Sequence, residues 1–119
     1  MTMKCIVIPA DPTQPCRLEY PHTLRDMQNL VGGYIEAVRV DKGRFLHPEL
    51  PPGVRAGHDV TLYVNEEYRL IENAQYNERA SRFYPWAGGI LGDAFICGAP
   101  TFDGEDRDAP NDLIELLIP

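Results

Sequence analysis

The 119-residue sequence has no apolar run close to the roughly 20 residues that a membrane-spanning helix requires. Its first residues also lack the charged start, long apolar segment and cleavage site of a signal peptide. Cysteine is scarce, and the three cysteines at positions 5, 16 and 97 are widely spaced, as is typical of reduced thiols. These absences predict a cytoplasmic protein that does not bind membranes.

Positive charge is also in short supply, and the formal net charge is -7. Residues 1–92 hold 11 acidic and 10 basic side chains, whereas residues 93–119 hold 7 acidic side chains and one basic side chain. This distribution offers no basic surface for phosphates, so we expect no direct nucleic-acid binding. The nearly neutral body also argues against an acidic mimic of DNA, whose carboxylates would be spread over the whole surface.

The chain lacks the residue spacings of the common catalytic and metal sites. Its histidines and cysteines form none of the pairs that zinc sites use, and no serine or cysteine lies in a nucleophile motif. Gly88–Gly92 is glycine-rich but precedes a predicted strand, and no phosphate-binding Lys follows it. Glu66 and Glu67 are adjacent on a predicted turn, where carboxylates diverge into water. We therefore expect a non-enzymatic protein without a metal or cofactor.

The spacing of apolar residues predicts short strands alternating with helices. Strands are expected over residues 4–8, 16–20, 34–40, 59–64, 68–71 and 90–97, the last interrupted by a kink at Gly92-Asp93. One helix is capped by Thr23 with Asp26 and ends at Gly32-Gly33. A second helix is capped by Asn73 and stopped by Pro85. Residues 41–58 are too rich in proline and glycine for a regular element and predict a long loop.

These elements predict an α+β domain with a single small sheet, mixed or mostly antiparallel, and two short helices on one face. The domain covers residues 1–100, and residues 101–119 form an acidic tail that ends in an apolar segment. That segment, Leu113–Ile118, is too apolar to stay in water. It packs on the body, adds a strand to the sheet or joins a second subunit in a homo-oligomer. The residue pattern of the predicted strand 34–40 does not decide which of its two faces is buried.

Several polar or aromatic side chains are not required by the hydrophobic pattern. These candidate binding residues are Gln28, Tyr34, Glu36, Asn65, Glu66, Glu67, Asn77, Arg79 and Arg82. They either hold turns and helix ends by hydrogen bonds or line a site. The structural role is the stronger one for Asn65, which can stabilise its own turn, and for Glu36 if it pairs across the sheet with an arginine.

The two arginines belong to an aromatic-rich run, residues 76–86, which can be interpreted in two ways. Arg79 and Arg82 among aromatic rings could hold an anionic or planar ligand. Alternatively, the run is an amphipathic helix with its aromatic side chains in the core and its arginines solvated or ion-paired. The helical interpretation predicts one buried face and one polar face. The buried face comprises Tyr76, Ala80, Phe83 and Tyr84, and the polar face Asn77, Glu78, Ser81 and Arg82.

Four motifs occur in a fixed order along residues 4–98. They are Leu24-x-x-Met27-Gln28-x-x-Val31-Gly32-Gly33-Tyr34-Ile35-Glu36, Val64-Asn65-Glu66-Glu67, Asn77-x-x-Ala80 and Ile90-x-Gly92-Asp93-Ala94-x-Ile96. In this order they resemble an uncharacterised domain family found in bacteriophages, plasmids and integrative elements of actinobacteria and firmicutes. Tyr68-Arg69 replaces the family's usual Gly-Lys after the second motif. The resemblance implies a mobile-element context and no mechanism, because the family has no established activity.

The functional expectation is a non-enzymatic accessory protein of a phage or mobile element that binds and modulates a host protein. A host-protein binder predicts an exposed apolar or acidic interface, for which the tail is the first candidate. The alternative is a protein that sequesters a small, nucleotide-like anionic ligand in a polar pocket. The acidic DNA mimic is the least favoured function, because the body of the chain, residues 1–92, is nearly neutral.

Overall fold

The computed structural model describes residues 3–40, 60–67, 70, 74–83, 88–98 and 107–119. Its strands are β1 (Cys5–Ile8), β2 (Arg17–Glu19), β3 (Ile35–Val40), β4 (Val60–Asn65), β5 (Tyr76–Asn77), β6 (Ile90–Leu91) and β7 (Ala94–Gly98). Its helices are α1 (Leu24–Val31), α3 (Glu78–Ser81) and α4 (Asn111–Leu117). The fold is α+β, as predicted, but a two-stranded sheet, β5-β6, accompanies the five-stranded one.

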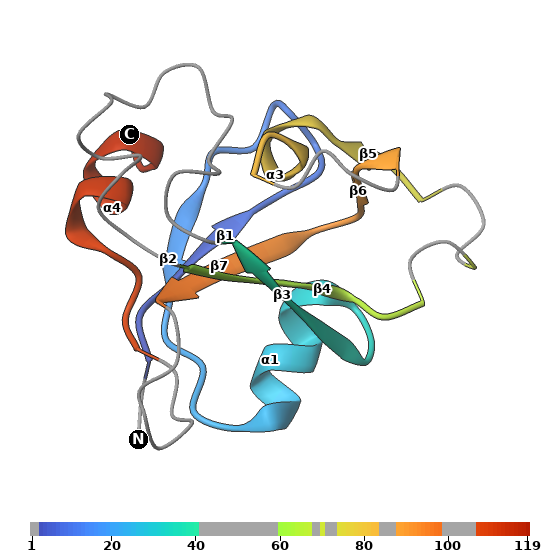
Figure 1. Ribbon diagram of the computed structural model, residues 1–119, viewed down its shortest axis with the longest axis horizontal. Helices are drawn as coiled ribbons and strands as arrows, with labels where there is room; N and C mark the ends of the chain where they lie inside the picture. The colour runs from blue at the N-terminus through green and yellow to red at the C-terminus, as the bar shows by residue number, and fades with distance from the viewer. Residues whose placement is uncertain (1–2, 41–59, 68–69, 71–73, 84–87, 99–106) are drawn as a thin grey trace.

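The larger sheet is antiparallel throughout and has the strand order β2-β1-β7-β4-β3 (Figure 1). Ile96 lies at its centre, opposite Ile6 of β1 and Leu62 of β4, and all three side chains are fully buried. Every residue of β1, β4 and β7 is buried. A strand covered on both faces has a continuous apolar run instead of an alternating one, which is the pattern that residues 4–8 and 94–98 show.

The helices cover opposite faces of this sheet, so the expectation that they share one face is wrong. Helix α1 packs on the face that carries Val7, Tyr63 and Phe95, where the two aromatic rings stack 4.9 Å apart. Residues of α3 and α4 pack on the other face (Figure 1). Because the central strands are apolar on both sides, each face of the sheet must be covered. Helix α4, which was not predicted, supplies part of the cover on the face opposite α1.

Strand β3 lies at the edge of the sheet and pairs with β4 along its whole length. Ile35 packs against the α1-side cluster, whereas Val38 and Val40 pack against the opposite cluster. Both faces of β3 therefore carry apolar side chains that pack against the protein. For this reason the residue pattern of the strand does not single out one buried face.

The first predicted helix is confirmed in its boundaries. Thr23 accepts a hydrogen bond from the Asp26 backbone N–H, and the Asp26 carboxylate accepts one from the Thr23 backbone N–H, which completes a capping box. Gly32 ends the helix in the left-handed region with φ 79°. The predicted kink at Gly92 is also confirmed, since its φ of 80° separates β6 from β7.

The second helix is shorter than predicted. It begins at Glu78, and its N-cap is Asn77 and not Asn73, which lies outside the described residues together with Tyr84 and Pro85. Three assignments to its faces are wrong, those of Tyr76, Asn77 and Ser81. Tyr76 is 52% exposed and not buried, and Asn77 on the polar face is fully buried.

The reason is that residues 76 and 77 belong to strand β5 and not to the helix. Ser81 is buried as well, because its hydroxyl donates to the Asn77 carbonyl and accepts from the Ile90 N–H. Ala80 and Phe83 lie in the core, as predicted.

The C-terminal segment packs on the body, which was one of the three predicted alternatives. Leu113 of α4 is fully buried in the cluster shared with α3. The segment leading to α4 is attached by two backbone hydrogen bonds, from Gly98 N to Arg107 O and from Ala109 N to Lys4 O. The predicted loop over 41–58 and the acidic run over 103–106 lie outside the described residues.

Of the predicted strand over 68–71, the structure describes Leu70 alone, in a 3-10 turn. None of the helices in the described part of the chain is long and apolar enough to cross a membrane.

Candidate functional site

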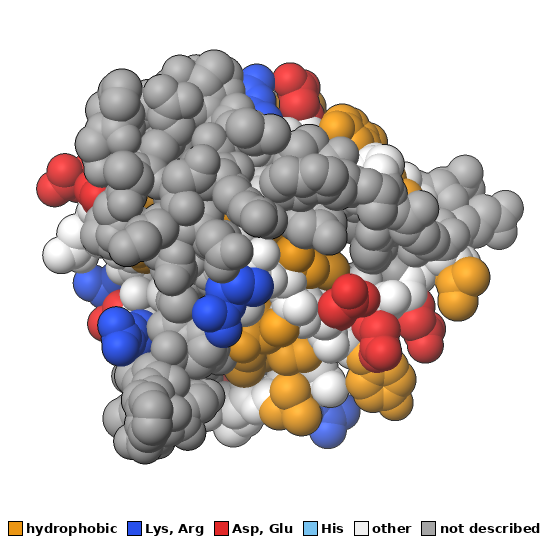
Figure 2. Space-filling view, in the orientation of Figure 1, with side chains coloured by type: hydrophobic (Ala, Val, Ile, Leu, Met, Phe, Trp, Pro, Cys, Tyr) orange, Lys and Arg blue, Asp and Glu red, His pale blue; other side chains and the backbone are white. Residues whose placement is uncertain are grey.

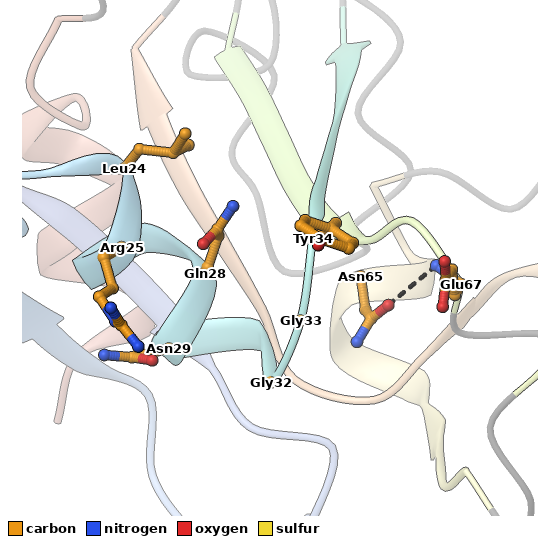
Figure 3. Close-up of a pocket in the computed structure, with 9 residues that line it drawn as sticks. All are labelled: Leu24, Arg25, Gln28, Asn29, Gly32, Gly33, Tyr34, Asn65 and Glu67. Carbon is orange, nitrogen blue, oxygen red and sulfur yellow. Dashed lines mark hydrogen bonds between the residues drawn. The ribbon is translucent and has the colours of Figure 1, made fainter.

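A depression of about 700 Å³ lies where the C-terminal end of α1 meets the start of β3 and the end of β4 (Figure 3). Its lining residues are Leu24, Arg25, Gln28, Asn29, Gly32, Gly33, Tyr34, Asn65 and Glu67. We call it the Tyr34 depression. It brings together four of the predicted binding residues, Gln28, Tyr34, Asn65 and Glu67, which come from three different segments of the chain.

The two glycines after α1 shape this depression. The N–H groups of Gly32 and Gly33 both donate to the Gln28 carbonyl, so the chain turns sharply out of the helix. A Cβ atom at Gly33 would lie 2.7 Å from Nδ2 of Asn65, whereas one at Gly32 would meet nothing within 4 Å. Gly33 therefore allows β3 to start directly against Asn65, and Gly32 leaves open space at the helix end.

Asn65 forms the floor of the depression. Its side chain is almost completely buried, and Nδ2 donates to the Val31 carbonyl at 3.2 Å while Oδ1 accepts from the Glu67 N–H at 2.8 Å (Figure 3). The Glu66 N–H adds a bond of 2.8 Å to the Tyr34 carbonyl. The bond from the Glu67 N–H is the turn-stabilising role that the sequence predicts for Asn65, and the bond to the Val31 carbonyl additionally joins this turn to the end of α1.

The rim of the depression is exposed. Tyr34 is 64% exposed and Leu24 is 58% exposed, although both are large apolar side chains. Figure 3 shows Leu24 and Gln28 on the side of α1 that faces Tyr34, whereas Arg25 and Asn29 are directed away from it. The rim therefore combines an aromatic ring and a leucine with an amide and the carboxylate of Glu67.

Acidic side chains surround the Tyr34 end of the sheet. Glu36, Glu66 and Glu67 are all exposed, and Figure 2 shows acidic side chains gathered near the end of the molecule where β3 starts. The expected pairing of Glu36 with an arginine across the sheet is wrong, because its neighbour on β4 is Val64. Among the described residues, none of these three carboxylates forms an ion pair.

Asn77 lies elsewhere, on the face of the sheet that α3 covers. It is fully buried, its Nδ2 donates to the carbonyls of Ile8 and Gly92 at 2.8 and 2.9 Å, and its Oδ1 accepts from the Ala80 N–H. These three hydrogen bonds serve the fold, because they join β1, the kink after β6 and the start of α3.

Arg79 is also engaged by the fold. Its Nη2 donates to the carbonyls of Pro9 and Asp11 at 2.7 and 3.0 Å, and Nη1 lies 3.7 Å from Sγ of Cys16. Burial raises the pKa of the Cys16 thiol, so the sulfur remains a neutral thiol and not a counter-ion. Arg79 thus holds the loop after β1, and its donors are directed at backbone carbonyls.

Arg82 forms an ion pair of 3.1 Å with Glu78, one helical turn earlier. This is the arrangement that the amphipathic-helix interpretation predicts for an arginine of this segment. The nine candidate residues therefore do not form one site, since the sheet separates Asn77, Arg79 and Arg82 from the Tyr34 depression.

Five lining residues were missed from the sequence, namely Leu24, Arg25, Asn29, Gly32 and Gly33. The signal for one of them, Leu24, was available. Leu24 precedes Gln28 by four residues on the same predicted helix, and that spacing places both side chains on one face. The glycines were interpreted only as a helix cap, because a residue without a side chain gives no sign of the surface it exposes.

Within the described ranges, no group of three His, Cys, Asp or Glu side chains could hold a metal ion. No protein-family model, curated protein or solved structure matches this chain.

Proposed function

We propose that this chain is a non-enzymatic protein that binds a host protein through the Tyr34 depression. The observation that carries the proposal is the exposure of Tyr34 beside an exposed Leu24, over a floor fixed by Asn65. Protein interfaces are enriched in tyrosine, because its ring supplies a large contact area at low entropic cost and its hydroxyl tolerates water. The bonds of Asn65, together with the bond from the Glu66 N–H to the Tyr34 carbonyl, fix the backbone that carries Tyr34 before a partner arrives.

The openness of the rim favours a protein over a small molecule. A site for a small molecule usually surrounds most of the ligand surface with apolar walls. Here the two largest rim side chains are each more than half exposed, so a small ligand would keep much of its own surface in water. A small anion is disfavoured further, because Glu67 is on the rim and Arg25 is directed away from Tyr34.

The resemblance to the phage and mobile-element family adds support from the sequence. The two motifs whose combination makes the resemblance specific contribute Gln28, Gly32, Gly33 and Tyr34 from one segment, and Asn65 and Glu67 from the other. Part of these two motifs therefore lines the depression, whereas Asn77 and Ala80 of the third motif are buried elsewhere in the fold. A function shared with that family would be expected at this surface.

The test is affinity capture from a lysate of a bacterial host, with mass spectrometry of the bound proteins and of the bound small molecules. Wild type is compared with Tyr34→Ala and with Tyr76→Ala, a matched control because Tyr76 is 52% exposed on β5. We expect one protein to be captured by wild type and Tyr76→Ala and lost from Tyr34→Ala. Equal capture by all three, or capture of a small molecule alone, would refute the proposal.

A further inference from the structure

The chemistry of the Tyr34 depression indicates what kind of partner group it can hold. We infer that it receives an arginine side chain of the partner protein, between the Tyr34 ring, the end of α1 and the Glu67 carboxylate. This inference rests on the proposed function and specifies the partner that the same surface would recognise. Three independent features of the depression favour a cation.

The first feature is the end of helix α1. Aligned peptide dipoles leave a partial negative charge at a helix C-terminus, and a Lys or Arg in the last turn usually compensates it. The last turn of α1 contains no basic residue. Gly32 follows it with open space around its Cα, and the Val31 carbonyl at this end accepts a hydrogen bond from the neutral amide of Asn65 and not from a basic side chain.

The second feature is the uncompensated acidic charge beside Tyr34. Elsewhere in the described structure, Glu19 pairs with Arg17 and Glu78 pairs with Arg82. Glu67 and its neighbour Glu66 form no ion pair with any described residue. Among the described residues Glu67 therefore has no ion-pair partner, although Arg25 lines the same depression on the side away from Tyr34, and a basic partner would supply the complementary charge.

The third feature is the geometry of the groups on the rim. A guanidinium is planar, stacks on an aromatic ring and donates several hydrogen bonds in its own plane. Tyr34 presents an exposed ring, and Gln28 and Glu67 on either side of it carry acceptor oxygens. Arginine suits this combination better than lysine, because a lysine ammonium is more strongly hydrated and stacks less well.

The probe for the test is Nα-acetyl-arginine amide, and its control is Nα-acetyl-citrulline amide, which has nearly the same shape without the charge. Both are titrated into the full-length protein at constant ionic strength, and binding is followed by NMR shifts of backbone amides. We expect saturable shifts at Gly33, Tyr34 and Glu67 with the arginine amide and at least about threefold weaker binding of the citrulline amide.

Two variants locate the contact. Glu67→Gln should weaken binding of the arginine amide, whereas Glu78→Gln should leave it unchanged, because Glu78 lies on α3 and pairs with Arg82.

Equal binding of the two amides, or no saturable shift at the depression, would overturn the inference. If that occurs while Tyr34→Ala still abolishes capture of the host protein, the proposed function stands without it. If the arginine amide binds but Tyr34→Ala retains capture, the proposed function is the part that fails.

Discussion

Arg79 and Tyr34 show why the roles of single residues depend on their neighbours. Both were candidates for binding, and both carry groups that could contact a ligand. Arg79 donates to two backbone carbonyls of the loop after β1, whereas the Tyr34 ring is exposed above the floor that Asn65 makes. The arginine therefore stabilises the protein, and the tyrosine is available to a partner.

The stabilising role of Arg79 can be measured by urea unfolding. Arg79→Ala should lower the free energy of unfolding by about 2–3 kcal/mol, because two hydrogen bonds from a charged donor are lost and two carbonyls lose their partner. Arg82→Ala is the matched control, with an expected loss of about 0.5 kcal/mol or less for an exposed pair one turn apart. A stable Arg79→Ala variant that no longer binds the host protein would show that Arg79 belongs to the binding site.

At the scale of elements, the end of α1 determines the shape of the candidate site. The helix stops at Gly32, β3 starts against Asn65, and the turn after β4 is held to the helix through the same asparagine. The depression is thus a consequence of how one helix and two strands are joined. A change in this junction should alter stability and the site together.

A double-mutant cycle at Gly33 and Asn65 tests this junction. Gly33→Ala should cost about 1–3 kcal/mol, because its new Cβ would displace the Asn65 side chain from the Val31 carbonyl. In an Asn65→Ala background the cost should fall by about 1 kcal/mol or more. Gly32→Ala should also destabilise, by roughly 1–2 kcal/mol for its positive φ, but its cost should be independent of Asn65. Additive effects of Gly33→Ala and Asn65→Ala would contradict the contact.

The elements that the sequence predicts well are those fixed by local signals. Helix α1 was correct at both ends, because Thr23, Asp26 and Gly32 act within one turn of it. Helix α3 was wrong at its start, because Asn77 is buried by hydrogen bonds to Ile8 and Gly92, which are distant in the sequence. No local pattern distinguishes such an asparagine from a solvated one.

The candidate site was predicted in part for the same reason. Its polar residues stood out because the hydrophobic pattern did not require them. Their division into two groups on opposite sides of the sheet follows from which face each helix covers, and that is a property of tertiary packing.

At the scale of the whole molecule, the C-terminal segment is part of the fold. Leu113 completes the cluster that also contains Phe83 and Ile96, and Ala109 N donates to the Lys4 carbonyl next to β1. The sheet is therefore covered on one face by α1 and on the other by α3 and α4 (Figure 1). The apolar run near the C-terminus is buried or partly buried by this packing, whereas Leu24 and Tyr34 stay more than half exposed.

Thermal and urea unfolding of Leu113→Ala test this contribution. We expect a loss of about 2–4 kcal/mol, because the side chain is fully buried and its removal leaves a cavity. Glu115→Ala on the exposed side of α4 should change stability by less than about 0.5 kcal/mol. Equal stability of the two variants would mean that α4 does not pack on the sheet in solution.

The most direct measurement of the central claim, that the Tyr34 depression is the binding surface, is site-specific photocrosslinking in host cells. The crosslinking residue p-benzoylphenylalanine replaces Leu24, which is 58% exposed on the rim, or Tyr76, which is 52% exposed on β5. The account predicts a covalent adduct with one host protein from position 24 and none from position 76. An adduct from position 76 with none from position 24 would contradict it.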